Sequence, residues 1–374
     1  MKILIATGIF PPQIGGPATY SKLLQDLLPS RGFSVEVVNF GDVLMFPKGI
    51  RHLIYFFKIV FRGVRADVIY AQDPVSVGLP AFIASKILRK KFYLKVVGDY
   101  AWEQFQIENP KLHNVRLEEF QARTCDWKTE VRKRIERSVA RGAVRVVVPS
   151  IYLKKIVSLW GVPEKRLTVI YNGFDAPVIS ENKEALRKKL GISGYTIVSV
   201  GRLVPWKGFS VLIDVMPEIM QKIPSAHIFI IGDGPENVGL KKKIEELHLD
   251  RSVTLLGKKP QKELFEYIKA SDVFILNTAY EGFSHQLLEV MALGAPIITT
   301  LEGGNSEIIT DRDNGLFVPY NDRLLIQEAV HTLCTDHAFA GNLVKNAQKK
   351  INEFSNERMI DALIKEFSGN NIGE

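Results

Sequence analysis

The sequence has few of the features that mark disulfide-stabilised, secreted or membrane-spanning proteins. Its 374 residues include only two cysteines, Cys125 and Cys334. Because they lie far apart, they exclude a disulfide framework and indicate a reducing compartment. No segment reaches roughly 18 uncharged apolar residues, so we expect no transmembrane helix. Residues 1–8 lack the cleavage pattern of a signal peptide and instead predict the first strand of a parallel sheet.

Three further absences limit the kinds of binding site. The loop after the first strand, Gly8–Tyr20, is too long for a Gly-x-Gly-x-x-Gly fingerprint, which argues against a dinucleotide cofactor. Acidic and imidazole side chains show no metal-ligand spacing, so neither a metal nor any other cofactor is expected. The sequence pI of about 9.2 is high, but the basic residues are dispersed and form no recognisable module. Nucleic acid is therefore not an expected partner.

The charge is distributed unevenly between the two halves of the chain. Residues 1–175 contain 27 Lys and Arg against 15 Asp and Glu, a net charge of +12, whereas the remainder holds 22 and 26, a net charge of −4. A basic first half can attract lipid headgroups, a lipid diphosphate or an acidic glycan. Solvated helices with basic outer faces explain the same excess, and both interpretations stay open.

Apolar segments alternate with helical segments along the chain, which is typical of parallel sheets covered on both faces. Two such sets, divided near residues 172–185, predict an α/β protein with two doubly wound, Rossmann-like domains facing across a cleft. The expected strands are residues 2–7, 34–40, 68–71, 92–97, 145–149 and 167–170, then 196–200, 227–231, 253–255, 273–276, 297–300 and 315–318. The expected helices of the first half are residues 18–28, 49–64, 78–88, 117–141 and 151–160.

The most informative segment is Tyr280–Thr299, in which a strand end, a short loop and a helix follow one another. Glu281 lies in the loop, Ser284 is the predicted N-cap, and Gly294 begins a Gly-Ala-Pro stop. A helix that starts just after a strand binds anions through its backbone N–H groups and its dipole. The pattern predicts a nucleotide-sugar site, with sugar hydroxyls on Glu281, a diphosphate at the helix N-terminus and ribose hydroxyls on Glu289.

Other strand ends supply further candidate residues. Arg202 and Lys207 flank the loop after the first strand of the second half, where two cations can grip a diphosphate and stabilise a leaving nucleoside diphosphate. The turn Gly232-Asp233-Gly234 and the later Gly257 are expected to line the pocket near a nucleobase. In the first half, Gly15-Gly16 lets the backbone approach a ligand. Asp99 with its neighbour Trp102 is a candidate for orienting an acceptor hydroxyl.

The stretch Arg51–Arg65 is a strongly apolar and aromatic helical segment with basic residues at positions 51, 58, 62 and 65. Such a helix can lie on an anionic membrane surface. A helix that covers the sheet and has a basic outer edge produces the same pattern, and we favour this second interpretation.

With these residues collected, the chain resembles the GT-B glycosyltransferases of the retaining family 4 over essentially its whole length. The motifs that recur in family order are Gly201-Arg202 with Lys207-Gly208, Gly232-Asp233-Gly234-Pro235, Glu281-Gly282-Phe283-Ser284 with Glu289, and Asn314-Gly315-Leu316. The resemblance implies that Arg202, Lys207, Glu281 and Asp99 serve catalysis. The implied donor-binding set is Gly15, Gly16, Gly201, Gly232, Gly234, Gly257, Gly282, Phe283, Ser284, His285 and Glu289.

Two structural expectations come with the resemblance. Many relatives carry a histidine at the end of the fourth strand that touches the donor sugar, whereas this chain has Gly98-Asp99 there. Either Asp99 takes over that role or the acceptor is handled differently. The expected domains are residues 1–175 on the acceptor side and 176–350 on the donor side. Residues 351–374 are expected to form a helix that crosses back to the first domain.

The implied activity is transfer of a hexosyl unit from a nucleoside diphosphate sugar to a hydroxyl of a glycan or lipid-linked acceptor. The resemblance implies retention of configuration, with Arg202 and Lys207 in place of a divalent ion. The expected location is the cytoplasm, at the inner membrane face if the basic half contacts anionic lipid, with a role in cell-envelope polysaccharide synthesis. A nucleotide-sugar epimerase of the same fold and a non-catalytic protein that binds nucleotide sugars remain the alternatives.

Overall fold

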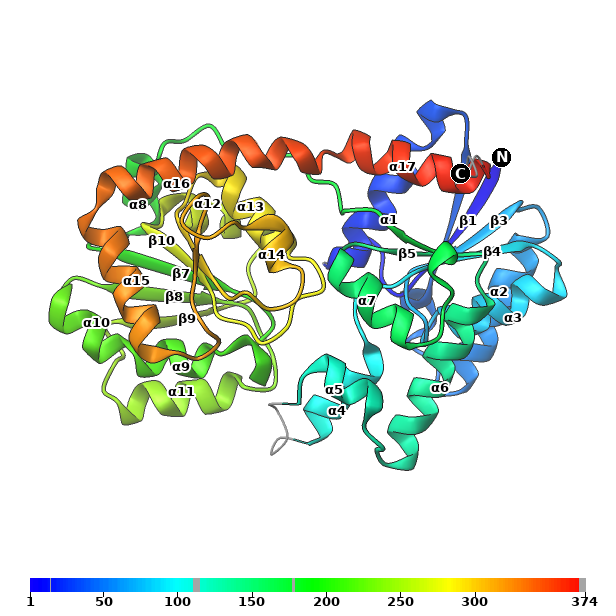
Figure 1. The fold of residues 1–374 in the computed structure, drawn as a ribbon, viewed down its shortest axis with the longest axis horizontal. Helices are drawn as coiled ribbons and strands as arrows, with labels where there is room; N and C mark the ends of the chain where they lie inside the picture. The colour runs from blue at the N-terminus through cyan, green and yellow to red at the C-terminus, as the bar shows by residue number, and fades with distance from the viewer. Residues whose placement is uncertain (14, 110–114, 177–178, 370–374) are drawn as a thin grey trace. The chain divides into compact units, whose positions relative to one another are not determined.

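The computed structural model describes residues 1–13, 15–109, 115–176 and 179–369, and the chain divides into two compact units (Figure 1). The first unit comprises Met1–Phe105, Val115–Gly173 and Asn356–Glu374, and the second comprises Gln106–Asn114 and Phe174–Ser355. Phe174 and Ser355, at the two ends of the long second segment, pair as an isolated parallel bridge.

The first unit is built on a six-stranded parallel sheet with the strand order β2-β1-β3-β4-β5-β6. These strands are short apolar segments whose central members are buried, as expected for a sheet covered on both faces. The chain reverses direction across the sheet between β1 and β3, so their carboxyl ends flank a topological switch point. The strands are β1 Lys2–Thr7, β2 Ser34–Asn39, β3 Val68–Ala71, β4 Lys91–Lys95, β5 Arg145–Val148 and β6 Leu167–Val169.

The second unit contains another six-stranded parallel sheet, with the order β12-β11-β10-β7-β8-β9 and a switch point between β7 and β10. The two sheets confirm the predicted α/β fold class with two Rossmann-like units, and several strands have the predicted bounds. The strands are β7 Thr196–Val200, β8 His227–Ile231, β9 Val253–Gly257, β10 Val273–Leu276, β11 Ile297–Thr299 and β12 Leu316–Phe317.

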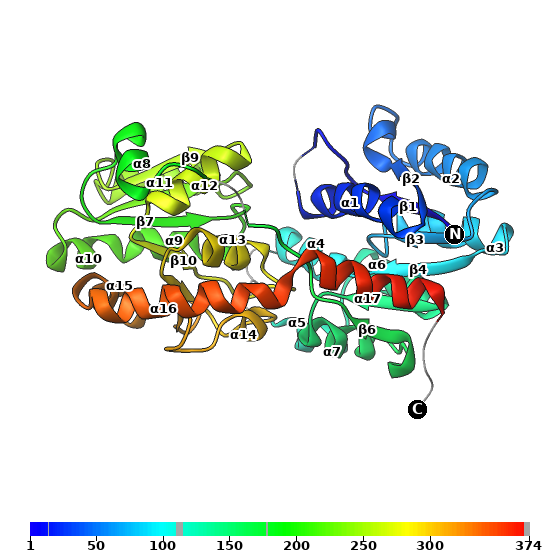
Figure 2. The same ribbon diagram turned by 90° about the horizontal axis from the view of Figure 1, so that it is seen from above.

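Helices cover both sheets (Figure 2). Those of the first unit are α1 Gly16–Leu27, α2 Ile50–Gly63, α3 Gly78–Ile87, α5 Leu117–Ala122, α6 Trp127–Gly142, α7 Ile151–Leu159 and α17 Asn356–Ser368. Helix α4, Tyr100–Glu108, begins in the first unit, and its residues from Gln106 onward are assigned to the second. The second unit has α8 Lys183–Leu190, α9 Phe209–Asp214, α10 Met216–Lys222, α11 Asn237–Glu246, α12 Gln261–Ala270, α13 His285–Leu293, α14 Asn305–Ile308, α15 Arg323–Thr335 and α16 His337–Lys350. Short 3₁₀ turns are Pro29–Arg31, Phe40–Val43, Glu164–Arg166, Pro205–Lys207 and Ile351–Phe354.

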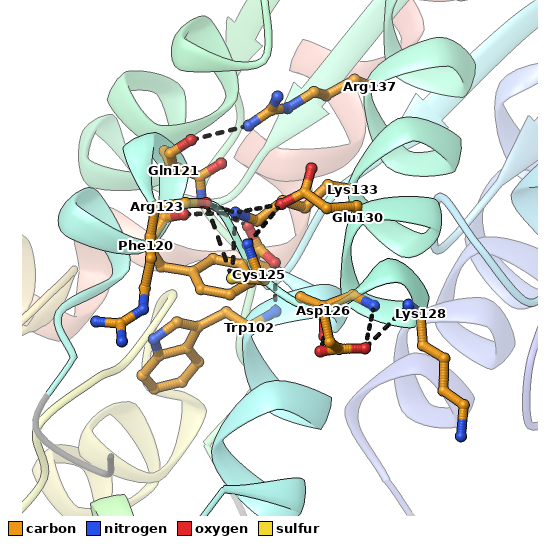
Figure 3. Close-up of polar contacts among 12 residues, drawn as sticks. Trp102, Phe120, Gln121, Arg123, Cys125, Asp126, Lys128, Glu130, Lys133 and Arg137 are labelled. Carbon is orange, nitrogen blue, oxygen red and sulfur yellow. Dashed lines mark hydrogen bonds and ion pairs between the residues drawn. The ribbon is translucent and has the colours of Figure 1, made fainter.

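The predicted single helix over residues 117–141 is wrong, because the chain breaks between α5 and α6 (Figure 3). The Asp126 side chain accepts hydrogen bonds from the backbone N–H groups of Lys128 and Thr129 and so caps α6. The ammonium of Lys133, a buried residue, donates to the carbonyls of Phe120 and Arg123, each at 2.7 Å. The sequence signals this break through Asp126, a typical N-cap residue. It does not show that Lys133, further along the chain, binds the two carbonyls.

Helix α17, near the end of the chain, completes the core of the first unit. Its buried residues Met359, Ile360, Leu363 and Phe367 join the cluster that contains Ile3, Ile5, Tyr70 and Tyr93. The ring of Phe367 meets those of Tyr70 and Tyr93 edge-on, at centroid distances of 5.3 and 5.2 Å. The first sheet therefore depends on a helix that the chain reaches only after the whole second unit.

We expect Phe367→Ala to lower the free energy of unfolding of the first unit by about 3–5 kcal/mol, because the truncation leaves a cavity between two buried tyrosines. Phe61→Ala is the matched control, since the Phe61 side chain is 78% exposed and its loss should change stability by less than about 1 kcal/mol. Urea unfolding of both variants measures the effect, and equal losses would contradict a core role for α17.

Candidate functional site

The carboxyl ends of β7 and β10 lie next to each other at the switch point of the second sheet. In open α/β sheets this is where ligands bind, because two adjacent loops depart in opposite directions there. Arg202 and Lys207 follow β7, and Glu281 follows β10. The fold therefore places the three residues of the second unit that were predicted to serve catalysis in two loops at one edge of the sheet.

Backbone hydrogen bonds hold the two loops against each other. The N–H of Ala279 donates to the carbonyl of Trp206 at 2.8 Å, and the hydroxyl of Thr278 donates to the same carbonyl at 3.1 Å. The amide of Asn277 donates to the carbonyl of Gly208 at 3.1 Å. A Cβ on Gly208 would lie 2.3 Å from that amide, so only glycine fits there. Asn277 was not predicted as a site residue, because its local signal is merely that of a polar residue directly after a buried strand.

Lys207 and Glu281 form an ion pair across the two loops. Their side chains are only 13% and 16% exposed, so the pair is weakly screened by solvent. Arg202 is exposed and its guanidinium lies over the ring of Trp206, 5.4 Å from the centroid. The site thus presents one half-buried cation that is paired with a carboxylate and one cation at the surface.

Helix α13 begins at His285, shortly after Glu281 in the chain. The N–H of Leu287 donates to the Ser284 hydroxyl at 3.4 Å, and Gly294 ends the helix in the left-handed conformation. The predicted N-cap and the predicted stop are both confirmed. Gly282, Phe283 and Ser284 are buried, and Phe283 packs on Phe354 at a ring distance of 5.7 Å. The helix N-terminus next to Lys207 and Glu281 is suited to a negatively charged ligand.

A second pair of glycines, which the sequence analysis missed, shapes this loop. The N–H of Gly304 donates to the carbonyl of Glu281 at 2.9 Å. A Cβ on Gly303 would come within 2.0 Å of that carbonyl, and one on Gly304 within 2.5 Å of the carbonyl of Gly282. Gly303-Gly304 follows β11, so a glycine pair at a strand end was the available signal.

The remaining predicted glycines of the second unit also lie at this edge of the sheet. The N–H of Gly201 donates to the carbonyl of Ile231 at 3.0 Å, and that of Gly232 donates to the carbonyl of Gly257 at 3.0 Å. A Cβ on Gly234 would lie 2.4 Å from the carbonyl of Leu203. These glycines let three neighbouring loops stack backbone against backbone.

Glu289 lies within α13, half-buried. Burial raises the pKa of its carboxyl to about 7, although a hydrogen bond with the side chain of Gln261 opposes the shift. Gln261 begins α12, shortly after Gly257, which was expected to line the pocket. It is a further residue that the sequence analysis did not name, and it orients the carboxylate predicted to bind ribose hydroxyls.

In the first unit, Asp99 is only 1% exposed. One of its oxygens accepts from the backbone N–H of Trp102 and the other from the side-chain amide of Gln121, both at 2.7 Å. Burial raises the pKa of Asp99, and it raises the pKa of the neighbouring Glu136 well above its usual range. Asp99 therefore supports α4 and α5 through hydrogen bonds to both oxygens.

Gly15 and Gly16 begin α1, where the carbonyl of Gly15 accepts from the N–H groups of Ala18 and Thr19. The other side of this switch point carries Asp73, directly after β3, which the sequence analysis missed. Its Oδ1 accepts from the N–H groups of Val75 and Ser76 at 2.8 and 2.6 Å. Its Oδ2 lies 3.9 Å from the position that a Cβ on Gly8 would occupy.

Asp73 thus faces the glycine-rich loop at the carboxyl ends of β1 and β3. Desolvation raises the pKa of its carboxyl, against the three backbone N–H groups that lower it. The available signal was a lone Asp at a strand end, which is common in ordinary βα loops. Only the strand order shows that this strand borders the switch point.

Two family models match the chain. The model described as glycosyl transferases group 1 matches residues 182–350, and the model described as glycosyltransferase family 4 matches residues 14–176. Together they span nearly all of both units.

Similar proteins were found over most of the chain. An uncharacterised glycosyltransferase of Methanocaldococcus jannaschii is 26% identical and is aligned over 94% of each chain. A component of the phosphatidylinositol N-acetylglucosaminyltransferase of Arabidopsis thaliana is 24% identical over 90% of this chain and 75% of that protein. The crystal structure of Anabaena HepE in complex with UDP-glucose superposes with a TM-score of 0.78 at 21% identity, covering 99% and 100% of the two chains.

We expect the stability of the second unit to fall as the pH rises through the range from Glu289's ordinary pKa to about 7. A carboxyl whose pKa is raised by folding binds more protons in the folded state, so ionisation costs stability on the order of 3 kcal/mol. The change should be absent in Glu289→Gln. Urea unfolding at pH 5 and pH 8 tests this, with the exposed Glu246→Gln as control. Parallel pH profiles for the wild type and Glu289→Gln would contradict it.

Proposed function

The chain belongs to the glycosyltransferases of the GT-B fold, and from this premise we propose that it moves a hexosyl unit from a nucleoside diphosphate sugar to an acceptor hydroxyl with retention of configuration. The observation that carries the proposal is the ion pair of Lys207 and Glu281 at the N-terminus of α13. The cation and the helix N-terminus suit a diphosphate, and the carboxylate suits the hydroxyl groups of the sugar joined to it.

In this proposal, donor binding exchanges the partners of the ion pair. The diphosphate replaces Glu281 as the partner of Lys207 and also binds the exposed Arg202. The carboxylate of Glu281 then accepts hydrogen bonds from the sugar hydroxyls. Neither charge is then left uncompensated in a half-buried site, which keeps the free-energy cost of the exchange low. The UDP-glucose bound to the structurally similar Anabaena protein is a ligand of this class.

The transfer breaks the bond between the anomeric carbon and the β-phosphate oxygen and forms a bond from that carbon to the acceptor oxygen on the same face. A β-phosphate oxygen takes the proton of the acceptor hydroxyl. Lys207, Arg202 and the helix terminus stabilise the charge that grows on the diphosphate, so they do the work for which a divalent ion would otherwise serve. Glu289 binds ribose hydroxyls.

On the acceptor side, we assign Asp73 rather than Asp99 to the acceptor hydroxyl. Both oxygens of Asp99 are engaged by Trp102 and Gln121, which makes it a positioning residue for α4 and α5. Asp73 keeps Oδ2 toward the loop of Gly8. A carboxylate there can orient a hydroxyl by accepting its hydrogen bond.

We further propose a glycan or lipid-linked acceptor that is met at the inner face of the cell membrane, in the synthesis of cell-envelope polysaccharide. The net charge of +12 on residues 1–175 supports an acceptor on an anionic surface. The name of the Arabidopsis relative, which refers to phosphatidylinositol, supports a membrane lipid as acceptor.

We expect one nucleotide series among UDP, GDP, ADP and their sugars to raise the melting temperature of the protein without added metal. Lys207→Ala and Glu289→Ala should abolish most of this shift, because they remove the diphosphate and ribose contacts. Glu281→Ala should lower donor turnover at least about 100-fold. Thermal unfolding and assays of released nucleoside diphosphate measure the two effects.

The matched control for these variants is Lys241→Ala, an exposed lysine on α11 of the same unit. It should leave both readouts unchanged. The proposed donor site would be refuted by the lack of a shift with any nucleotide. Conversion of the donor sugar without an acceptor would instead indicate an epimerase.

We expect Asp73→Asn to raise the acceptor KM or lower kcat at least about tenfold, because the amide accepts the hydroxyl hydrogen bond less strongly than a carboxylate. The nucleotide-induced thermal shift should not change, since Asp73 lies in the first unit. Asp26→Asn, on the exposed face of α1, is the control. Steady-state kinetics with saturating donor make the comparison, and unaltered acceptor kinetics would return Asp73 to a purely structural role.

A further inference from the structure

A stripe of large apolar side chains lies exposed on α2, which Figure 2 shows at the edge of the first unit, and on the turn that precedes it. The most exposed members are Met45 at 81% and Phe61 at 78%. We call this set the α2 surface, and it consists of Leu44, Met45, Phe46, Ile50, Leu53, Phe57, Phe61 and Val64. So many exposed large apolar residues in one short segment are unusual, because isolated apolar side chains are the norm at protein surfaces.

The α2 surface is not the face that attaches the helix to the sheet. That face carries Tyr55, Ile59 and Gly63, which are buried, and the Tyr55 hydroxyl donates to the carbonyl of Val38 at 2.9 Å. With about 100° of rotation per residue, positions 50, 53, 57, 61 and 64 fall on the opposite side within roughly a quarter of the circumference. The sheet-covering role that the sequence favoured is therefore filled without this stripe.

Basic residues accompany the stripe. Residues 44–65 contain five Lys or Arg and no Asp or Glu, namely Lys48, Arg51, Lys58, Arg62 and Arg65. Within the described residues, Lys58 pairs with Asp42 and Arg62 pairs with Glu36, both at 3.6 Å and with the cations at least one-third exposed. Exposed pairs of this kind contribute little and release their cations readily.

We infer that the α2 surface lies on an anionic lipid bilayer, with the apolar stripe in the headgroup boundary and the basic residues against lipid phosphates. An amphipathic helix with aromatic residues on one face and Lys and Arg beside it binds in this way. None of the described helices is long and apolar enough to cross a bilayer, so the contact is peripheral. A second copy of the chain fits less well, because a symmetric contact would set like basic edges against each other.

The bilayer contact deepens the proposed placement at a membrane. It rests on the proposed function only for the reason why the protein binds there, which is access to a lipid-linked acceptor. It brings the first unit, which carries Asp73 and the Gly15-Gly16 loop, to the surface that holds a lipid-linked acceptor. The bilayer contact itself needs no donor, so it can be tested apart from transfer.

The test is sedimentation of the full chain with vesicles of phosphatidylglycerol and phosphatidylcholine, and with vesicles of phosphatidylcholine alone. We expect at least about tenfold stronger binding to the anionic vesicles, reduced by salt. The double variant Phe57→Glu with Phe61→Glu should lose at least about tenfold in affinity, as should Lys48→Glu with Arg65→Glu. The matched control is Val238→Glu with Leu324→Glu, at exposed apolar positions of the second unit.

Wild-type protein that does not bind anionic vesicles would overturn the inference, as would equal binding to both vesicle types. Vesicle binding that survives both α2 double variants would also overturn it, because another surface would then be responsible. A dimer in sedimentation velocity that Phe57→Glu with Phe61→Glu dissociates, without vesicle binding, would assign the surface to a second copy instead. The nucleotide-induced thermal shift, measured on the same samples, reports separately on folding and on the donor site.

Discussion

The ion pair between Lys207 and Glu281 is the interaction on which the candidate site of the second unit depends. The two residues come from loops that leave neighbouring strands in opposite directions, and the pair joins these loops at the switch point. Asn277, Thr278 and the glycine carbonyl at 208 hold the loops in place by hydrogen bonds. Because each charge compensates the other in a half-buried position, the site is stable when empty and has matched partners to offer an anionic ligand attached to a polar one.

In the first unit, the main constraint is the burial of carboxylates near the ends of β3 and β4. Asp99 and Glu136 are almost fully buried and accept hydrogen bonds from backbone N–H groups and an amide. The cost of burying them is offset by fixing the start of α4 and the position of α5. Asp73 uses one oxygen in the same way and keeps the other toward the loop of Gly8. The two aspartates therefore differ in role because they differ in how many of their oxygens the fold has engaged.

Helix α2 shows how one element can serve two surfaces. Tyr55 and Ile59 attach it to the sheet of the first unit, and the opposite face carries apolar side chains that stay exposed. A helix that only covered a sheet would be expected to carry polar residues on that outer face. The apolar outer face and its basic neighbours are therefore better explained by contact with the proposed bilayer than by packing in the core of the unit.

The sequence by itself determined the two sets of alternating strands, the start of α13 at Ser284 and its end at Gly294, because periodicity and capping are local properties. It also placed Arg202, Lys207 and Glu281 at strand ends. Only the tertiary structure decided which strand ends are neighbours, and hence that Lys207 meets Glu281 and that Asp73 borders a switch point. The burial of Asp99, the binding of the Phe120 and Arg123 carbonyls by Lys133, and the position of Phe367 between two tyrosines depend on packing or on partners elsewhere in the chain. Such contacts leave no periodic trace in the sequence, since they arise from strand order and long-range packing rather than from the residues on either side.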